Sequence, residues 1–188
     1  MNAMPFPSFR APGSPGFTLI ELLVTMVVVA ILMAIAVPAF NNFVLDDRDA
    51  NQINSLVSSF NYARSEAVKR NTPTGVSVCP SSNAATCNNP GTGWSAGWIV
   101  LDNATNTVLQ AVPALGGANT LSTIGAGANG GLTYRSTGAT TNGALVTVKV
   151  CDLRGGPFAR DVEVNVLGNI ASSPAHGQSA TRGALACP

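Results

Sequence analysis

One apolar stretch near the N-terminus constrains this chain more than any other feature of its sequence. From Phe17 to Val37 the residues read FTLIELLVTMVVVAILMAIAV, 21 in all. Between Arg10 and Asp46 the only charged residue is Glu21. A helix rises 1.5 Å per residue, so about 20 apolar residues cross the roughly 30 Å hydrocarbon core of a bilayer. No comparable stretch follows, and the sequence therefore predicts one membrane-spanning segment.

The composition agrees with one apolar segment attached to a weakly charged domain. Of the 188 residues, 46% are hydrophobic and 10% are charged, and the formal net charge is +1. An ordinary soluble domain has about 25% charged residues. The chain is too apolar to be a disordered linker. It also has too few cations for general nucleic-acid binding, which depends on many contacts to phosphates.

Neither a secretory signal peptide nor a plain membrane anchor explains the apolar stretch well. A secretory signal has an apolar core of about 7–15 residues followed by a small-residue cleavage site. Here the stretch is longer and continues into Pro38 without an Ala-x-Ala exit. A plain anchor would not place Glu21 five residues into the stretch, where a carboxylate is costly and marks a functional position.

The residues Gly16-Phe17-Thr18-Leu19-Ile20-Glu21 resemble the class III signal of type IV prepilins and type II secretion pseudopilins. The resemblance implies that prepilin peptidase cuts after Gly16 and methylates the new N-terminal amine of Phe17. The apolar stretch would then remain as the first helix of the mature subunit. Glu21 is expected to serve subunit assembly by meeting the Phe17 amine of a neighbour, which removes two desolvated charges together.

The charges that flank the apolar stretch predict its orientation in the bacterial inner membrane. Arg10 precedes the stretch, whereas Asp46, Asp47, Arg48 and Asp49 follow it. Basic residues favour the cytoplasmic side, so the C-terminal part of this single-pass chain is expected in the periplasm. The resemblance implies that the subunit then joins a pilus fibre or a pseudopilus. Its expected partners are other major and minor pilins or pseudopilins, prepilin peptidase, the inner-membrane assembly platform and the lipid bilayer.

The helical pattern resumes after Pro38, a residue that would kink or locally unwind a helix rather than necessarily end it. Apolar residues recur at spacings of three and four, which predicts an amphipathic helix that ends near Arg70 and Asn71, before Pro73. The stripe comprises Ile53, Leu56, Val57, Phe60, Ala63 and Ala67. Four segments follow from these signals: a leader (1–16), a membrane and filament-core helix (17–37), its amphipathic continuation (38–71) and a β-rich periplasmic domain (72–188).

Short alternating segments separated by Gly, Asn and Ser predict strands after residue 74. The expected strands are residues 76–78, 97–101, 108–112, 132–135, 145–151 and 162–167. Residues 113–131 are rich in Gly and Ala and are expected to form a long irregular connection, and residues 172–188 show little periodicity. The predicted fold class is α+β: one long N-terminal helix laid on a mainly antiparallel sheet, as in type IV pilins.

Two further segments resemble the FimT/FimU and GspH branch of minor pilins and pseudopilins. They are YARSEAVKRN, residues 62–71, and GWIV, residues 97–100, while the closing Ala186-Cys187-Pro188 resembles the end of FimU-like proteins. The resemblance implies a minor pilin that helps to initiate or cap a type IV pilus and supports pilus biogenesis, twitching motility and adhesion. The alternative of the same fold is a GspH-like minor pseudopilin of a type II secretion system.

The four cysteines are Cys79, Cys87, Cys151 and Cys187, and they allow three disulfide connectivities. An oxidising periplasm favours disulfides over free thiols. We favour Cys79–Cys87, which closes a polar loop, and Cys151–Cys187, which ties the C-terminal tail to a strand. The FimU-like resemblance implies the second pair as well.

No residue pattern in the sequence indicates catalysis, a metal site or a cofactor. The chain has one histidine, His176, and it lacks Cys-x-x-Cys spacing and a Gly-x-Ser-x-Gly elbow. The Gly-rich residues 125–131 lack the following helix that a phosphate-binding loop requires. We therefore expect a structural subunit rather than an enzyme, with no cofactor.

DNA binding for natural transformation is the alternative from another functional class. Some FimT-like minor pilins bind DNA through a C-terminal Gly-Arg-x-Arg pattern, but residues 168–171 read GNIA here and lack both arginines. The remaining candidate phosphate contacts are Lys149, Arg154, Arg160 and Arg182. Asp152, Asp161 and Glu163 lie among them, so scattered surface charge is the favoured interpretation.

Overall fold

The structure, a computed structural model, describes residues 16–88, 93–124, 130–181 and 183–187. It separates into two units, Met1–Phe43 and Val44–Pro188. One helix, α1 (Leu19–Arg70), contributes to both units and has 52 residues. We describe each unit by itself.

Local signals explain where α1 begins and ends. Thr18 precedes the helix, and its hydroxyl oxygen accepts the Glu21 backbone N–H at 3.3 Å, an N-cap bond. At the other end Asn71 takes a left-handed conformation with φ 49°, which commonly terminates a helix. The helix continues through Pro38 rather than ending there.

The second unit contains two four-stranded sheets and a short two-stranded ribbon, and every strand pair is antiparallel. The first sheet has the order β3-β2-β1-β5, with β3 Thr107–Val112, β2 Trp98–Asp102, β1 Val76–Pro80 and β5 Leu132–Tyr134. The second has the order β4-β6-β7-β8, with β4 Thr120–Ile124, β6 Val146–Cys151, β7 Arg160–Val164 and β8 Ile170–Ser172. The ribbon pairs β9 (Gln178–Ser179) with β10 (Gly183–Ala184), and 3-10 turns occupy Trp94–Ala96 and Gly156–Phe158.

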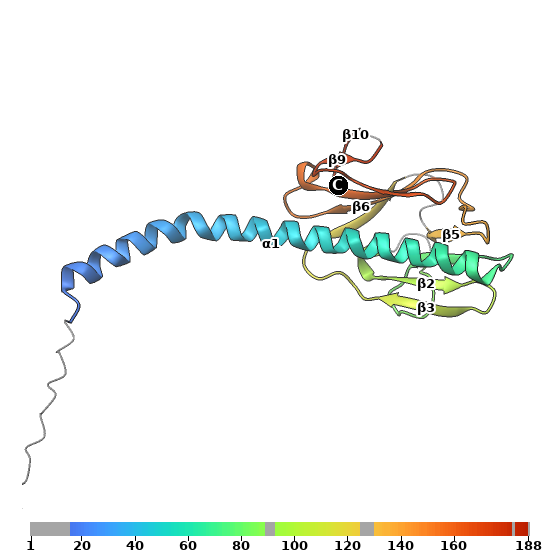
Figure 1. The fold of residues 1–188 in the computed structure, drawn as a ribbon, viewed down its shortest axis with the longest axis horizontal. Coiled ribbons are helices and arrows are strands. Elements are labelled where there is room, and N and C mark those ends of the chain that lie inside the picture. Colours follow the sequence, from blue (N-terminus) through green and yellow to red (C-terminus); the bar gives the residue numbers. More distant parts are fainter. Residues whose placement is uncertain (1–15, 89–92, 125–129, 182, 188) are drawn as a thin grey trace, which may run out of the picture. The chain divides into compact units, whose positions relative to one another are not determined.

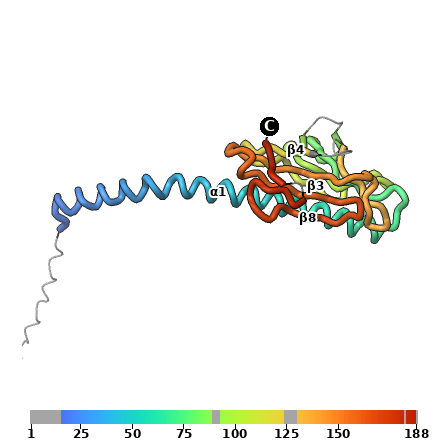
Figure 2. The backbone as a smooth tube through the Cα atoms, turned by 90° about the horizontal axis from the view of Figure 1, so that it is seen from above, coloured from blue at the N-terminus to red at the C-terminus, as the bar shows by residue number. Residues whose placement is uncertain are grey.

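The second part of α1 lies alongside the strands of both sheets (Figures 1 and 2). One hydrophobic core joins it to both sheets. The predicted stripe supplies the helix side of this core: Ile53, Leu56, Phe60, Ala63 and Ala67 are buried and Val57 is partly buried. The sheets contribute buried residues from β1, β2, β4, β5, β6 and β7. The core therefore depends on contacts between segments that are far apart in the sequence.

The α+β fold with a long N-terminal helix is confirmed, but three expectations for the β-rich region were wrong. The strands form two sheets rather than one. Residues 113–131 are not irregular throughout, because β4 pairs with β6, and the Ser95 hydroxyl accepts the Leu121 N–H at 2.7 Å. The tail likewise contains β9, β10 and the end of β8. β8, β9 and β10 have only two or three residues each, and β4 pairs with a strand that is distant in the sequence, so local periodicity does not reveal them.

Candidate assembly site

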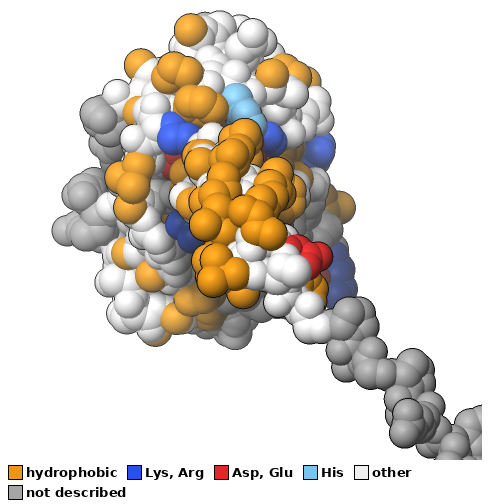
Figure 3. Space-filling view, turned by 90° about the vertical axis from the view of Figure 1, so that its left-hand side faces the viewer, with side chains coloured by type: hydrophobic (Ala, Val, Ile, Leu, Met, Phe, Trp, Pro, Cys, Tyr) orange, Lys and Arg blue, Asp and Glu red, His pale blue; other side chains and the backbone are white. Residues whose placement is uncertain are grey.

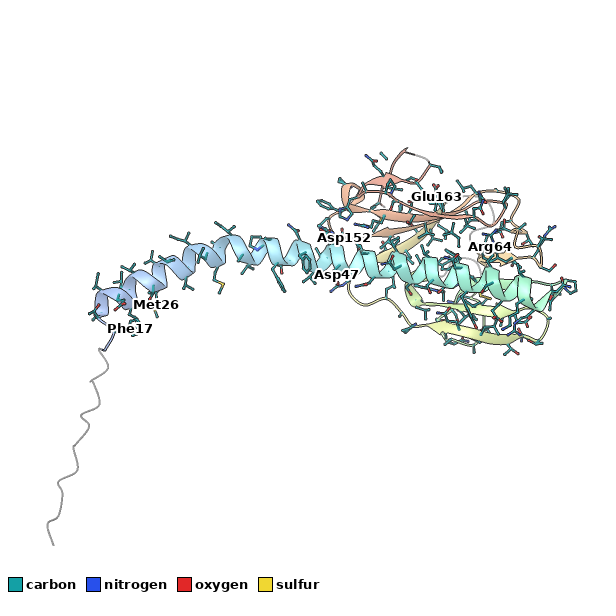
Figure 4. The ribbon with its side chains drawn as sticks, viewed as in Figure 1. Phe17, Met26, Asp47, Arg64, Asp152 and Glu163 are labelled. Carbon is teal, nitrogen blue, oxygen red and sulfur yellow. A yellow bond between two sulfur atoms is a disulfide. The ribbon has the colours of Figure 1, made fainter. Side chains whose placement is uncertain are left out.

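The first unit presents an apolar helix surface with nothing packed on it. Every residue from Gly16 to Val44 is exposed, and the Phe17 side chain is 81% exposed. Figure 3 shows hydrophobic side chains gathered around this part of α1, and Figure 4 labels Phe17 and Met26 on it. Such a surface is unfavourable in water and calls for a bilayer or neighbouring helices.

The same helix is long and apolar enough to cross a membrane. Its most apolar 18-residue window has a mean hydropathy of 2.8, and none of that window is buried in the chain's own structure. One such helix near an N-terminus is also what a signal sequence or a core helix would give, but a core helix would be buried. The exposed window therefore agrees with the expected membrane anchor.

Gly16, Phe17 and Glu21 lie together at the start of this exposed segment. Apart from Gly16 and its two chain neighbours, no described atom lies within 4 Å of the position that a Cβ on Gly16 would take, and Gly16 is exposed. Phe17 and Thr18 precede the first helical residue, and Glu21 lies in the first helical turn. A carboxylate in the first turn interacts favourably with the positive end of the helix dipole. The arrangement leaves Gly16, Phe17 and the Glu21 side chain exposed.

Both disulfides of the favoured pairing are present in the second unit. Cys79 and Cys87 join the end of β1 to the loop that follows it, and their Cα atoms lie 5.5 Å apart. Cys151 at the end of β6 joins Cys187 near the C-terminus, with Cα atoms 5.9 Å apart. Lys149 reinforces the second closure, because its ammonium donates to the Ala186 carbonyl. The disulfides therefore secure two segments that have little regular structure of their own.

The structure does not bring the candidate DNA contacts together as a free basic patch. Lys149 is 6% exposed and is engaged with the C-terminal segment. Arg154 contacts three carboxylates, and Arg160 lies 2.6 Å from the His176 imidazole, measured from Nη2 to Nε2. Arg182 lies outside the described residues. Each of the three described candidates thus has a partner within the chain, and the carboxylates around Arg154 oppose phosphate binding there.

Arg154 organises a cluster of charges where α1 meets the loop after β6. Its Nη2 atom lies 2.6 Å from Asp152, 2.7 Å from Asp46 and 3.7 Å from Asp49. Its guanidinium carbon also lies 4.2 Å from the centre of the Phe158 ring. The cluster holds the β6–β7 connection against the helix, a function that is structural rather than nucleic-acid binding.

Sequence periodicity missed the buried polar residues of α1. Asp49 is fully buried, and its carboxylate accepts the Asn119 amide N–H at 2.6 Å. The same amide group donates to Gln52 at 2.9 Å. Burial raises the pKa of the Asp49 carboxyl above its ordinary value of 3.8, and the neighbouring Asp152 carboxylate adds to the rise. Asn119 lies next to the unexpected strand β4, so no local signal pointed to these contacts.

A second polar contact ties the end of α1 to β2. Arg70 lies 2.8 Å from Glu66 and 3.0 Å from Asp102. The Arg70 hydrogen bond is the main cause that lowers the pKa of Glu66. The Ala104 backbone N–H, with a further contribution from Arg70, lowers the pKa of Asp102. These ion pairs fix the helix end over the sheet.

The two tryptophans and the histidine make contacts within the folded domain. Trp94 and Trp98 are buried, and the Trp98 indole N–H donates to the Ser59 hydroxyl at 2.9 Å. His176 lies 3.8 Å from Asp46 and contacts Phe158. Within the described residues no group of three or more His, Cys, Asp or Glu side chains could hold a metal ion.

Two family profiles match the chain. The profile described as type II transport protein GspH matches residues 52–168, and the profile described as prokaryotic N-terminal methylation motif matches residues 13–37. The second range includes Gly16, Phe17 and Glu21. No protein in the curated set matches the chain.

The fold is similar to that of a solved pilin subunit. The type IV minor pilin FimU of Pseudomonas aeruginosa is 20% identical, with a TM-score of 0.53 over 72% of this chain and 92% of FimU. A second crystal form of FimU is also 20% identical, with a TM-score of 0.48 over 67% of this chain and 90% of FimU. At this identity the first match shows a shared fold.

Proposed function

Because the chain belongs to the GspH family of type II transport proteins and carries an N-terminal methylation motif, we propose that it is a minor pilin that helps to initiate or cap a type IV pilus. The observation that carries this proposal is the exposed apolar surface of α1 from Leu19 to Phe43, directly after Gly16 and Phe17. A subunit of this kind is anchored by that surface in the membrane and packs it against other subunits in the fibre. The family and the fold are structural rather than enzymatic.

Maturation is the first step of the proposed function. Prepilin peptidase cuts after Gly16, removing 16 residues, and the new amine of Phe17 is methylated. The exposed position of Gly16 supports this step. Mass spectrometry of the N-terminus in wild-type and peptidase-null cells tests it. We expect a methylated Phe17 terminus in the wild type only, and an identical N-terminus in both strains would refute the proposal.

Glu21 then fixes where the subunit packs along its neighbours in the fibre. In a lipid-like environment its carboxylate pairs with the Phe17 amine of a neighbour, because each charge alone is costly there. We expect Glu21→Ala to block recovery of the protein in sheared fibres while the periplasmic domain stays folded. Thr25→Ala is the matched control, since Thr25 is also exposed on α1 and only donates to Leu22 of its own helix. Normal recruitment of Glu21→Ala would exclude the pairing role.

The family description favours one other candidate function. A GspH-like minor pseudopilin would share the processing, the membrane anchor and the fold, but it would serve a type II secretion system. The other subunits of the assembly differ between the two candidates. Deleting the gene separates them: loss of twitching motility with intact secretion supports the pilus, whereas loss of secretion alone supports the pseudopilus.

A further inference from the structure

Strand β3 lies at one edge of the first sheet. It pairs with β2 along one side, and among the described residues no strand pairs with its other side. That side presents main-chain N–H and C=O groups, which are a template for another strand. The sequence of β3, TVLQAV, contains no charged residue and no proline. Such residues usually protect exposed edges, and β3 has neither.

The register of β3 leaves a regular stretch near its end. The pairing with β2 shifts between Val100 and Leu101, whose partners are Gln110 and Val108. Leu109 is the extra residue at this irregularity. From Gln110 to Val112 the pairing with β2 is continuous, and Trp98 faces Val112. The irregularity twists the strand but places nothing over its free edge.

A groove follows the free edge of β3 beneath α1. One hollow of about 460 Å³ lies between α1 and the end of β3 with its following loop, and its walls include Asn51, Ser55 and Val112. A second hollow of about 260 Å³ is lined by Ser58, Tyr62, Leu109 and Gln110. On the helix side, the positions 51, 55, 58 and 62 form one stripe with helical spacing. The two hollows therefore lie in line along the same face of α1.

The dimensions of the groove suit one extended strand. From Asn51 to Tyr62 a helix advances about 16 Å, at 1.5 Å per residue. A β-strand of about five residues covers that length, at roughly 3.3 Å per residue. A strand that paired with β3 would continue the sheet beneath α1, so its side chains on that face would contact the helix stripe.

The groove also has the polarity expected for such a strand. Asn51, Ser55 and Ser58 offer uncharged hydrogen-bonding groups, and Tyr62 offers a ring that is 36% exposed. Asp47 and Arg48 also line the first hollow, one charge of each sign, so its walls carry no net charge. The Gln110 Oε1 atom is buried and accepts no hydrogen bond from the described residues. A buried acceptor without a donor is costly, and a donor on an added segment would remove that cost.

We propose that the free edge of β3 is a strand-addition site for an extended, uncharged segment of another pilin subunit. The segment pairs its backbone with β3 and places small or polar side chains against the stripe formed by Asn51, Ser55, Ser58 and Tyr62. The inference rests on the proposed function, because the other subunits of the assembly supply the strand. It adds a contact made by the periplasmic domain to the contacts made by the apolar helix.

Site-specific photocrosslinking of the full chain in producing cells tests the proposal. A photoreactive residue replaces Gln110 or Val112 in turn, and Ala171 is the matched control, since it is an exposed residue of β8 at the edge of the other sheet. We expect adducts from positions 110 and 112 to map to one segment of another pilin subunit, two residues apart. The control position should give no adduct with that segment. Adducts that scatter over several segments, or that join two copies of this chain, would overturn the proposal.

A charge in the groove provides the blocking experiment. Gln110→Lys places an ammonium group where the strand would lie, and we expect the adduct yield from position 112 to fall at least about tenfold. Ala171→Lys should leave the yield unchanged. Ser58→Lys introduces the charge from the exposed helix wall and gives the same result if Gln110→Lys does not fold. An unchanged yield in the folded variants would contradict strand addition.

Processing at Gly16 and recovery in fibres are measured in the same samples. Full incorporation without adducts at β3 overturns strand addition and leaves the assembly function standing. Adducts in register from a processed protein that never enters fibres support strand addition and count against the assembly function.

Discussion

The two parts of α1 have the same secondary structure and opposite surroundings. From Leu19 to Phe43 every residue is exposed, although nearly all of them are apolar. From Val44 to Arg70 a stripe is buried, although Asp49, Gln52, Ser59 and Glu66 are polar and lie within it. The first part therefore keeps its apolar surface free, whereas the second part buries a stripe against the two sheets.

Hydrophobicity alone therefore does not identify the core of this protein. The most apolar segment contributes nothing to the core cluster, whereas the less apolar continuation supplies five of its buried residues, Ile53, Leu56, Phe60, Ala63 and Ala67. The apolar surface of the first part is available for lipid and neighbouring subunits. Among changes in α1, only those in the second part should therefore alter the stability of the unit Val44–Pro188.

A matched pair of phenylalanines tests the comparison most strongly. Phe60 is fully buried and Phe40 is 65% exposed on the same helix. Phe60→Ala should lower the free energy of unfolding of the domain by about 3–5 kcal/mol, because it removes apolar contacts and leaves a cavity. Phe40→Ala should not change it measurably. Denaturant unfolding of the full chain in detergent, followed by tryptophan fluorescence, measures both. A large loss in Phe40→Ala would break the comparison.

Proline substitution tests the backbone of the two parts. The first part already accommodates Pro38. Ser65 is exposed in the second part, so Ser65→Pro changes the backbone without removing a core side chain. We expect a loss of about 3 kcal/mol or more from the missing hydrogen bond and the steric clash. Pro38→Ala should leave the unfolding of the domain unchanged. Equal effects of the two substitutions would show that the parts unfold together.

Because Arg70 forms ion pairs with Glu66 and Asp102, we expect the free energy of unfolding of the unit Val44–Pro188 to depend on pH. The lowered pKa values of Glu66 and Asp102 mean that both carboxylates stabilise the fold when ionised. This contribution is complete above their ordinary values of 4.5 and 3.8 and is lost as the pH falls through the lowered values.

Arg70→Met should therefore destabilise the domain near neutral pH, by less than Phe60→Ala does, and the deficit should shrink below about pH 4. Arg135→Met is the control, since Arg135 is exposed and no described carboxylate forms an ion pair with it. Thermal unfolding across the pH range measures the effect. A deficit in Arg70→Met that is constant with pH would rule out the ion pairs as its cause.

The smallest effect should come from the buried carboxylate of Asp49. Its raised pKa means that ionisation opposes folding, and this cost is full above the raised value and absent below 3.8. Asp49→Asn keeps a hydrogen-bond acceptor, and Arg154 keeps Asp46 and Asp152 as partners. We expect a gain of less than about 1 kcal/mol near neutral pH that vanishes in acid. Exposed Asp47→Asn should give no gain, and a loss in Asp49→Asn would show that its charge stabilises the cluster.

Local sequence patterns predicted the elements that depend on residues close together in the chain. The helix stripe, the end of α1 near Asn71 and most strands follow from residue spacing and turn residues. The favoured disulfide pairing is confirmed as well. It was predictable because Cys79 and Cys87 are close in the sequence and because Cys187 lies in the tail. The contacts of Arg154, Asn119 and Arg70 could not be predicted, because each joins segments whose proximity is decided by the packing of the sheets on α1.

The amino-acid sequence alone was enough to predict one apolar helix directly after a methylation motif, because Gly16, Phe17, Glu21 and a 21-residue apolar stretch form a contiguous pattern. It also determined that a β-rich region follows. Local patterns did not show that this region forms two sheets around one core, nor that β3 has a free edge beside a groove. The hydrogen bonds and the buried face of a helix depend on residues three or four positions apart, so the sequence pattern predicts them. Strand order, the burial of polar groups and the presence of a free edge depend on contacts between residues that are distant in the sequence.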